Sequence, residues 1–207
     1  MSQGTANKST LLQLRRQAEF LEQGQELLER KRELLNRLVQ ERLAQYRPLL
    51  AESKAAVAGA WRWLGMTQMR MSACELRQAS LGAPPALHVS ILPRRSLGVE
   101  FPALTVQRNA PQPVGLMGTD ASFDESRLHL AHAAELLARL GAVETALTRL
   151  LAEQRKTQKR VNALKYQIIP RTRARIRQIE ALLEEDERAA LFQIKVLRER
   201  SHVAIAG

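Results

Sequence analysis

Aromatic residues are scarce in this chain: Phe, Trp and Tyr together make up 4% of its 207 residues. Leucine and alanine are abundant instead, and 26% of the residues are charged. Such a composition is typical of long helices that bury a narrow apolar stripe, and it argues against a compact core. The length would allow one or two compact domains, so composition rather than length indicates the fold class.

Cysteine is nearly absent, since Cys74 is the only one. A single cysteine forms no intramolecular disulfide and no cysteine-based metal cluster, which is typical of a reducing compartment. No apolar run approaches the ~18 residues of a membrane-spanning helix. Residues 1–10 are polar and lack the apolar core of a secretory signal. We therefore expect a cytoplasmic protein without a direct membrane span.

The sequence also lacks the arrangements that catalysis requires. It has no glycine-rich phosphate-binding loop ending in Gly-Lys-Ser/Thr. His129 and His132 could share a metal ion but have no further ligands at a suitable spacing, and Cys74 has no obvious activating base. We therefore predict no catalytic, cofactor-binding or metal-binding residues, and a protein that is not an enzyme.

Residues 1–78 show a heptad repeat of leucine, which predicts one helix of a left-handed coiled coil. Thr10 and Gln13 fit a capping box at its start. Pro48 predicts a bend rather than a stop, and the helical pattern continues to about Gln78. The predicted seam residues of this helix are Leu14, Leu21, Leu28 and Leu35.

Residues 79–121 differ in composition, with prolines in short clusters. Two strand-like runs, Leu87–Leu92 and Val99–Val106, flank a loop over Pro93–Gly98 and predict a β-hairpin at about 87–106. A lone hairpin is marginal in water, so it must pack on the helices or on a partner. Residues 109–120 are expected to form a loop. The hairpin residues singled out are Val89, Ile91, Val99 and Phe101.

Residues 122–207 return to a helical pattern, with a capping box predicted at Ser122 and Glu125. The seam follows one heptad position as far as Pro170 and slips by one residue after it. Its predicted members are Leu140, Leu147, Val161, Ile168, Ile176 and Leu183. Neither terminal helix has a stripe wide enough to be stable alone. We therefore predict an all-α dominated fold, in which the N-terminal and C-terminal helices form a long antiparallel coiled coil with a small middle segment.

Positive charge is concentrated near the end of the chain. The formal net charge is +11, and residues 154–178 contain Lys and Arg but no Asp or Glu. Three interpretations are open: a solvated face, a nucleic-acid surface, or a surface enclosed by an acidic protein cavity. A basic leucine zipper places its basic region beyond the zipper, whereas heptads lie on both sides here. The cations proposed to contact a partner are Lys156, Lys159, Arg160, Arg171, Arg173, Arg175 and Arg177.

Two stretches of the sequence have a distinctive pattern. One is Lys8-Ser9-Thr10-Leu11-Leu12-Gln13-Leu14 at the N-terminal end, and the other is Arg160-Val161-Asn162-Ala163-Leu164, with Tyr166 and Ile169-Pro170-Arg171, near the other end. They resemble the D subunit of the V/A-type ATPases, the central rotor shaft, and the second stretch matches that family's most distinctive motif. The resemblance covers both helical regions. Lys165 departs from the pattern, because the family usually has glutamate there.

The resemblance implies a noncatalytic rotor component that couples ATP synthesis or hydrolysis to ion translocation through a membrane ring. The coiled coil would stand inside a hexamer of A and B subunits, bind the small F subunit, and seat on the funnel-shaped C subunit (called d in some organisms). It would lie on the cytoplasmic side of the membrane and bind no nucleic acid. The alternative is a basic coiled-coil protein that binds nucleic acid or serves as an adaptor.

Overall fold

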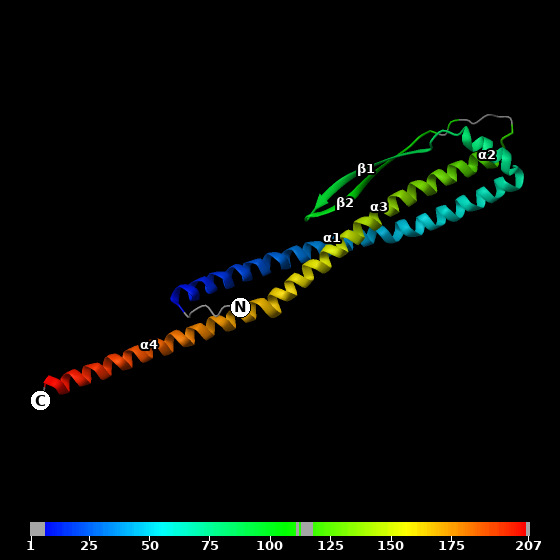
Figure 1. Ribbon diagram of the computed structural model, residues 1–207. Helices are drawn as coiled ribbons and strands as arrows, with labels where there is room; N and C mark the ends of the chain where they lie inside the picture. Colours follow the sequence, from blue (N-terminus) through cyan, green and yellow to red (C-terminus); the bar gives the residue numbers. More distant parts are fainter. Residues whose placement is uncertain (1–6, 111, 113–117, 206–207) are drawn as a thin grey trace. The chain divides into compact units, whose positions relative to one another are not determined.

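The structure is a computed structural model that describes residues 7–110, 112 and 118–205, with side chains as far as residue 198. Part of the loop predicted at residues 109–120 lies outside these ranges. The elements are, in chain order, α1 (Lys8–Arg70), α2 (Ala73–Leu81), β1 (Leu87–Ser96), β2 (Val99–Arg108), α3 (Ala121–Ala163), the π-helix η1 (Leu164–Ile168) and α4 (Ile169–Ile205) (Figure 1). This confirms the prediction of two long terminal helical regions and one small antiparallel hairpin.

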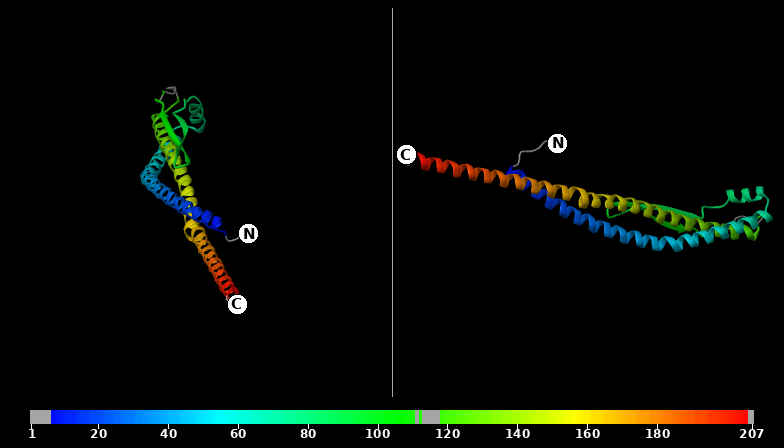
Figure 2. Two further views of the ribbon diagram at one scale, coloured as in Figure 1. Left: turned by 90° about the vertical axis from the view of Figure 1, so that its left-hand side faces the viewer. Right: turned by 90° about the horizontal axis from the view of Figure 1, so that it is seen from below.

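The chain divides into two compact units. We call Met1–Arg32 with Lys156–Gly207 the terminal unit, and Glu33–Arg155 the central unit. In each unit a stretch of α1 packs against a stretch of the C-terminal helices. Within the central unit, α2 lies beside the ends of α1 and α3 (Figures 1 and 2).

Helix α1 begins at Lys8, where the N–H of Leu11 donates to the carbonyl of Asn7 at 3.0 Å. The predicted capping position at Thr10 was therefore wrong, because Thr10 already lies in the first turn. The helix continues through Pro48, as expected. The proline removes the backbone donor to the carbonyl of Ala44, and Ala44 and Pro48 are both exposed.

The prediction that the first helix reaches Gln78 was wrong, because α1 ends at Arg70 and a separate helix begins at Ala73. Ser72 and Glu75 form a capping box between the two helices. The Glu75 N–H donates to the Ser72 hydroxyl at 3.3 Å, and the Ser72 N–H donates to the Glu75 carboxylate at 2.9 Å. The bond from Ser72 holds the pKa of Glu75 below its ordinary value. A capping box satisfies donors that a new helix start leaves unpaired, so Ser-x-x-Glu was the signal for this break.

The hairpin has a two-residue turn at Leu97 and Gly98, with Ser96 paired to Val99. Both turn residues have positive φ, 51° at Leu97 and 81° at Gly98. Such turns match the twist of the two strands. The predicted loop over Pro93–Gly98 was therefore too long, because its first four residues belong to β1.

Pro93 and Pro102 face each other across the hairpin. Pairs alternate between hydrogen-bonded and non-hydrogen-bonded types, and counting from the turn makes this pair non-hydrogen-bonded. The missing N–H groups therefore belong to the outer edges, one on each strand. The hydrogen bonds between β1 and β2 are therefore all kept, while the free edge of each strand is less able to pair with another strand.

The core of the central unit joins three elements, α1, β2 and α3. Its buried residues are Leu35, Val39, Val99, Leu147 and Leu150, and Leu97 packs against them. Burying an aliphatic side chain of this size contributes about 1.5–3 kcal/mol. Two hydrogen bonds hold the hairpin against α3. Arg149 of α3 donates to the carbonyl oxygen of Glu100 at 2.9 Å, and Arg108 of β2 donates to the carbonyl oxygen of Leu128 at 3.4 Å. The hairpin is thus packed on the helices.

Pro170 is the second residue after a π-helical turn in the second long helical region. A regular α-helix would place the proline ring against the carbonyl of Tyr166 and would leave that carbonyl without a donor. Here the Ile169 N–H donates instead to Leu164, five residues back. A π-helical turn adds one residue to the helix. This additional residue accounts for the one-residue slip that the heptad repeat of the sequence shows here.

Candidate partner-binding surfaces

Three ion pairs join α1 to α4 in the terminal unit, at intervals of seven residues. They link Lys8 to Glu187 at 2.8 Å, Arg15 to Glu180 at 2.6 Å, and Glu22 to Arg173 at 2.7 Å. The numbers rise along α1 as they fall along α4, so the helices are antiparallel. Seven-residue intervals are those of positions that flank a coiled-coil seam. We call these pairs the ion-pair ladder.

The ladder specifies register more than it adds stability. All three pairs are largely solvent-exposed, and such pairs contribute only about 0–1 kcal/mol each. The hydrogen bond and charge of Glu187 raise the pKa of Lys8, and Lys8 in turn lowers the pKa of Glu187. A shift of one residue in α4 would separate every pair at once.

The predicted seam residues differ in burial. Leu35, Leu140, Leu147 and Val161 are buried, whereas Leu14, Leu21, Leu28, Ile176 and Leu183 are half-buried. Ile168 is 42% exposed, and its neighbour Ile169 is only 5% exposed. The buried position thus moves from Ile168 to Ile169. The cause is the π-helical turn, which spaces Val161 and Ile169 eight residues apart.

The seven cations proposed as partner contacts are all exposed. Arg173 belongs to the ladder, where it donates through Nε at 3.0 Å and Nη2 at 2.7 Å to the Glu22 carboxylate. The other six make no ion pair with any residue that the structure describes. They are Lys156, Lys159, Arg160, Arg171, Arg175 and Arg177, which we call the unpaired cations.

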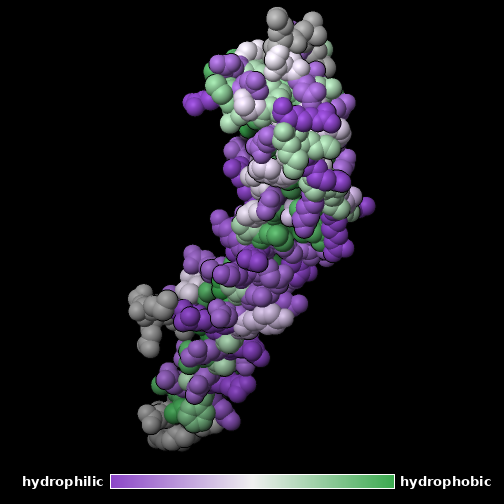
Figure 3. Space-filling view, turned by 90° about the vertical axis from the view of Figure 1, so that its right-hand side faces the viewer, coloured by the Kyte–Doolittle hydropathy of each residue, from purple (hydrophilic) through white to green (hydrophobic). Residues whose placement is uncertain are grey.

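The hairpin exposes part of its apolar surface. Val99 and Phe101 are 7% and 8% exposed, and Arg42 lies over the Phe101 ring at 5.5 Å. Val89 and Ile91 are 40% and 63% exposed. Of the four hairpin residues singled out from the sequence, Val99 and Phe101 therefore pack the hairpin on the helices, whereas Val89 and Ile91 face solvent. The surface in Figure 3 is mainly hydrophilic, with scattered hydrophobic patches.

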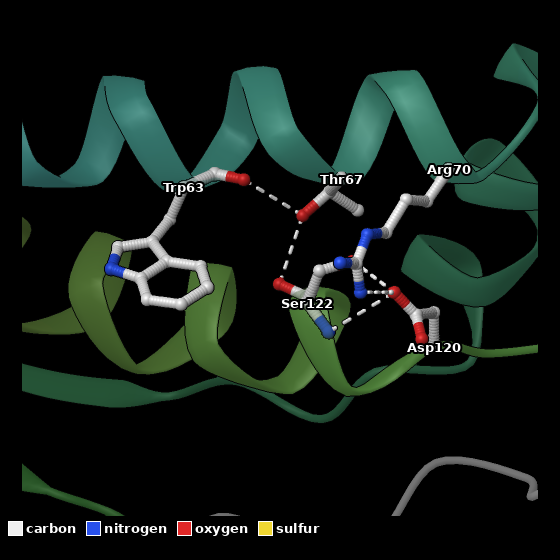
Figure 4. A network of polar contacts seen from close by, with 5 residues as sticks. All are labelled: Trp63, Thr67, Arg70, Asp120 and Ser122. Carbon is white, nitrogen blue, oxygen red and sulfur yellow. Dashed lines mark hydrogen bonds and ion pairs between the residues drawn. The ribbon is translucent and has the colours of Figure 1, made fainter.

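A polar network joins the end of α1 to the start of α3 (Figure 4). The Thr67 hydroxyl lies 2.9 Å from the carbonyl oxygens of both Trp63 and Ser122. The Asp120 carboxylate accepts from the Ser122 hydroxyl at 2.6 Å and from Arg70 at 3.1 Å. These bonds, chiefly that from Ser122, lower the pKa of Asp120 to about 2. The network fixes the point at which the chain reverses.

The predicted capping box of Ser122 and Glu125 was wrong. Helix α3 begins at Ala121, and Asp120 occupies the capping position, where its carboxylate also accepts from the backbone N–H of Ser122 at 3.4 Å. A carboxylate at a helix N-terminus meets unpaired N–H groups and the positive end of the helix dipole. Sequence reasoning also missed the stacking of Trp63 on His129, with ring centroids 5.7 Å apart.

Together these features define an antiparallel two-helix coiled-coil protein with a β-hairpin packed beside the coil. None of its described helices is both long enough and apolar enough to cross a lipid bilayer.

A family profile for the ATP synthase D subunit matches residues 10–199. The V-type ATP synthase D subunit of Thermotoga neapolitana is 32% identical over 194 residues, which cover 93% of this chain and 96% of that protein. The A-type ATP synthase D subunit of Pyrococcus furiosus is 30% identical, covering 91% and 90% of the two chains. The V-type ATP synthase D subunit 2 of Treponema pallidum is 31% identical, covering 93% of each. The chain belongs to the family of ATP synthase D subunits.

Proposed function

We propose that this protein is the central-stalk rotor of a V/A-type rotary ATPase. In this role it couples ATP synthesis or hydrolysis in a hexamer of A and B subunits to ion translocation through a membrane ring. It contributes no catalytic residue. The observation that carries the proposal, beyond family membership, is the terminal unit: two antiparallel helices in fixed register, with the unpaired cations on their exposed surface.

An asymmetric coil inside a threefold arrangement of catalytic pairs makes different contacts with each pair. Contacts that differ between an open and a closed state shift the population of those states. As the coil turns, each pair passes through the same sequence of contacts. Coupling therefore needs a coil that transmits torque without changing register, and the ladder supports this because all of its pairs would break together.

The unpaired cations suit a moving contact. They occupy several directions around the helix, because successive residues are about 100° apart. Exposed charges act over roughly 8 Å at physiological ionic strength, so they attract acidic loops without demanding one fixed angle. We propose that Lys156, Lys159, Arg160, Arg171, Arg175 and Arg177 face carboxylates of the hexamer, and that Arg173 chiefly holds the coil together.

The remaining partners follow from the same assignment. The F subunit would bind the coil near the hairpin, where Val89 and Ile91 are exposed. The C (or d) subunit would connect the shaft to the membrane ring. The protein would then be peripheral, on the cytoplasmic side of the membrane.

Reconstitution with the A/B hexamer tests the proposal. ATP hydrolysis should acquire rotation only when this chain is present. Ion translocation should follow once the F subunit, the C (or d) subunit and the membrane ring are added. Failure of the chain to bind the hexamer, together with salt-dependent retention on DNA, would instead support a nucleic-acid-binding coiled coil.

A charge-reversal series tests the role of the cations. Arg171→Glu with Arg175→Glu should weaken hexamer binding and torque, and should leave the helical signal of the chain unchanged. Arg173→Glu is the matched control, because it should loosen the coil through its clash with Glu22. Unchanged torque in the first variant would eliminate the proposed contact between the cations and the hexamer.

A further inference from the structure

Three arginine side chains from three different elements line one cavity of the central unit. Arg42 comes from α1, Arg94 from β1 and Arg139 from α3. The cavity has a volume of about 660 Å³, which lies within the roughly 300–1,000 Å³ of small-molecule sites. Among the described residues that line it, the only other ionisable one is Glu52 of α1. The wall of the cavity thus carries a surplus of positive charge.

The register of the hairpin places Arg94 on the face that packs against the helices. Arg94 lies directly opposite Phe101, and the side chains of opposite residues point to the same face. Phe101 is 8% exposed, and the guanidinium of Arg42 lies over its ring at 5.5 Å. Arg94 is itself exposed and makes no ion pair or hydrogen bond with any residue that the structure describes. Its charge is therefore open to a ligand in the cavity.

The neighbouring Arg95 differs from Arg94 in both respects. Successive side chains of a strand point to opposite faces, and Arg95 pairs with Glu100 at 3.7 Å on the outer face. Arg95 does not line the cavity. Two adjacent residues of the same charge thus differ in their pairing and in their access to the cavity.

Arg42 and Arg139 are each held by one polar contact that leaves other donors open. Nη1 of Arg42 donates to the side-chain oxygen of Gln45 at 3.1 Å, and Nη2 of Arg139 pairs with Glu135 on the same helix. A guanidinium has five N–H donors, so both groups retain donors that a ligand can use. These contacts also restrict the two side chains, which lowers the entropy that is lost on binding.

The groups of the cavity indicate the chemistry of its ligand. A guanidinium favours phosphate oxygens, because its planar fork matches their geometry. Glu52 adds a condition, because a carboxylate repels a bare phosphate anion but accepts a hydrogen bond from an amine or a hydroxyl group. Leu104 and Val143 provide apolar surface in the same cavity, which suits the flat face of a base. A nucleotide has all three of these parts.

We propose that this cavity binds a nucleoside diphosphate or triphosphate. Its phosphates lie against Arg42, Arg94 and Arg139, and an amine or hydroxyl group of the nucleoside donates to Glu52. The ligand contacts α1, the hairpin and α3 at once, so its binding should stabilise their packed arrangement. No hydrolysis is assigned to the site, and binding there does not depend on the proposed rotor function.

Calorimetric titration of the full chain with ADP tests the site and requires no other subunit. We expect one ADP per chain. Arg94→Gln should weaken binding by about tenfold or more, which is the factor for one hydrogen bond to a charged group. Arg95→Gln is the matched control, because it removes the same charge from the adjacent position, and it should bind ADP as the unmodified chain does. Circular dichroism of each variant checks its folding.

Pyrophosphate distinguishes a nucleotide from the phosphate group alone. Glu52→Ala should lower the affinity for ADP relative to pyrophosphate by about tenfold, since it removes an acceptor for the nucleoside and a repulsion against the phosphates. This variant should stay helical, because alanine is favourable in an exposed part of a helix. Equal effects on the two ligands would show that the site selects the phosphate group only, and would overturn the assignment to a nucleotide.

Two further results would overturn the proposal in different ways. If the Arg94→Gln and Arg95→Gln variants bind ADP equally, the general positive charge of the chain attracts it and the cavity is not its site. If ADP does not bind, the proposal fails, and binding of polyglutamate that depends on Arg94 would then identify a surface for an acidic protein. None of these titrations involves the hexamer, so the rotor proposal is tested separately by reconstitution.

Discussion

Replacing Pro170 with alanine should leave the π-helical turn in place. Proline explains why a regular α-helix is unfavourable at this point, but the packing on either side also requires the extra residue. Val161 and Ile169 are 1% and 5% exposed, and they are eight residues apart. A regular α-helix through this segment would rotate everything after it by about 100° relative to the seam.

The energies favour retention of the turn. Rotating α4 would expose Ile169 and Ile179, which are 5% and 6% exposed, at about 1.5–3 kcal/mol each. It would also break the ion-pair ladder, at about 0–1 kcal/mol per pair. Against this, alanine restores one backbone N–H, whose hydrogen bond is worth about 0.5–1.5 kcal/mol. The free energy lost at the seam therefore exceeds the free energy gained from a regular helix, so the π-helical turn should remain. Pro170→Ala should change the free energy of unfolding by no more than about 1.5 kcal/mol.

Deleting Gln167 provides the complementary perturbation. It removes the inserted residue, so a regular α-helix then satisfies both halves of the seam. With Pro170 retained, the deletion should destabilise the chain by about 3 kcal/mol, because proline enters a regular helix interior. Deletion combined with Pro170→Ala should recover that loss.

Urea unfolding followed by circular dichroism measures these stabilities. Register is read with a short bismaleimide cross-linker between Arg15→Cys and Glu180→Cys, in a Cys74→Ala background, since Cys74 is exposed. Cross-linking should persist in the Pro170→Ala variant. Its loss, accompanied by a regular helix at Leu164–Ile168, would show that the proline alone determines the turn and would refute this reasoning.

Three further predictions concern single interactions. The pKa of Asp120 is lowered from 3.8 to about 2, so its contribution to the stability of the fold is present above pH 4 and is lost as the pH falls towards 2. Asp120→Asn should remove this loss of stability between pH 4 and 2, as measured by urea unfolding. The control variant Asp124→Asn should retain it. Gly98→Ala should cost about 1 kcal/mol of unfolding free energy, entirely through its positive φ, because no atom lies within 4 Å of the added Cβ. A double-mutant cycle on Glu22 and Arg173 should give a coupling below about 1 kcal/mol that decreases in high salt; a larger, salt-independent coupling would contradict a solvent-exposed pair.

The long-range pattern was readable from the sequence because heptads average over many residues. The slip near Pro170 was visible in the heptad repeat of the sequence, but the π-helical turn that causes it was not. A bend and an inserted residue both accommodate a proline. The structure distinguishes them by the bond from the Ile169 N–H to Leu164 and by the burial of Ile169 in place of Ile168. Local boundaries were less predictable. Several residues can cap a helix, and the contacts of the capping Asp120 include a bond to Arg70, which is distant in sequence.

The ion-pair ladder was also missed, for a different reason. Its members were visible as charges with seven-residue spacing, but α1 contains many such charges. Pairing Glu22 with Arg173 rather than with a neighbour on its own helix requires the register of the two helices. That register depends on the single residue inserted before Pro170. Contacts across the coil thus depend on a local detail that periodicity alone does not specify.

The two units hold their helices together by different means, with a consequence for partner binding. The central unit has a buried core that joins α1, β2 and α3, whereas in the terminal unit the described buried apolar residues are Ala18, Val161, Ile169 and Ile179. The terminal unit therefore relies more on exposed ion pairs, which salt weakens, and it should open first. It also carries the unpaired cations, all of which lie on α3 and α4 and none on α1. A partner that binds those cations only when α1 and α4 are paired would stabilise the paired state. If the proposed function holds, the terminal unit should therefore be more rigid when the hexamer encloses it than in the free chain.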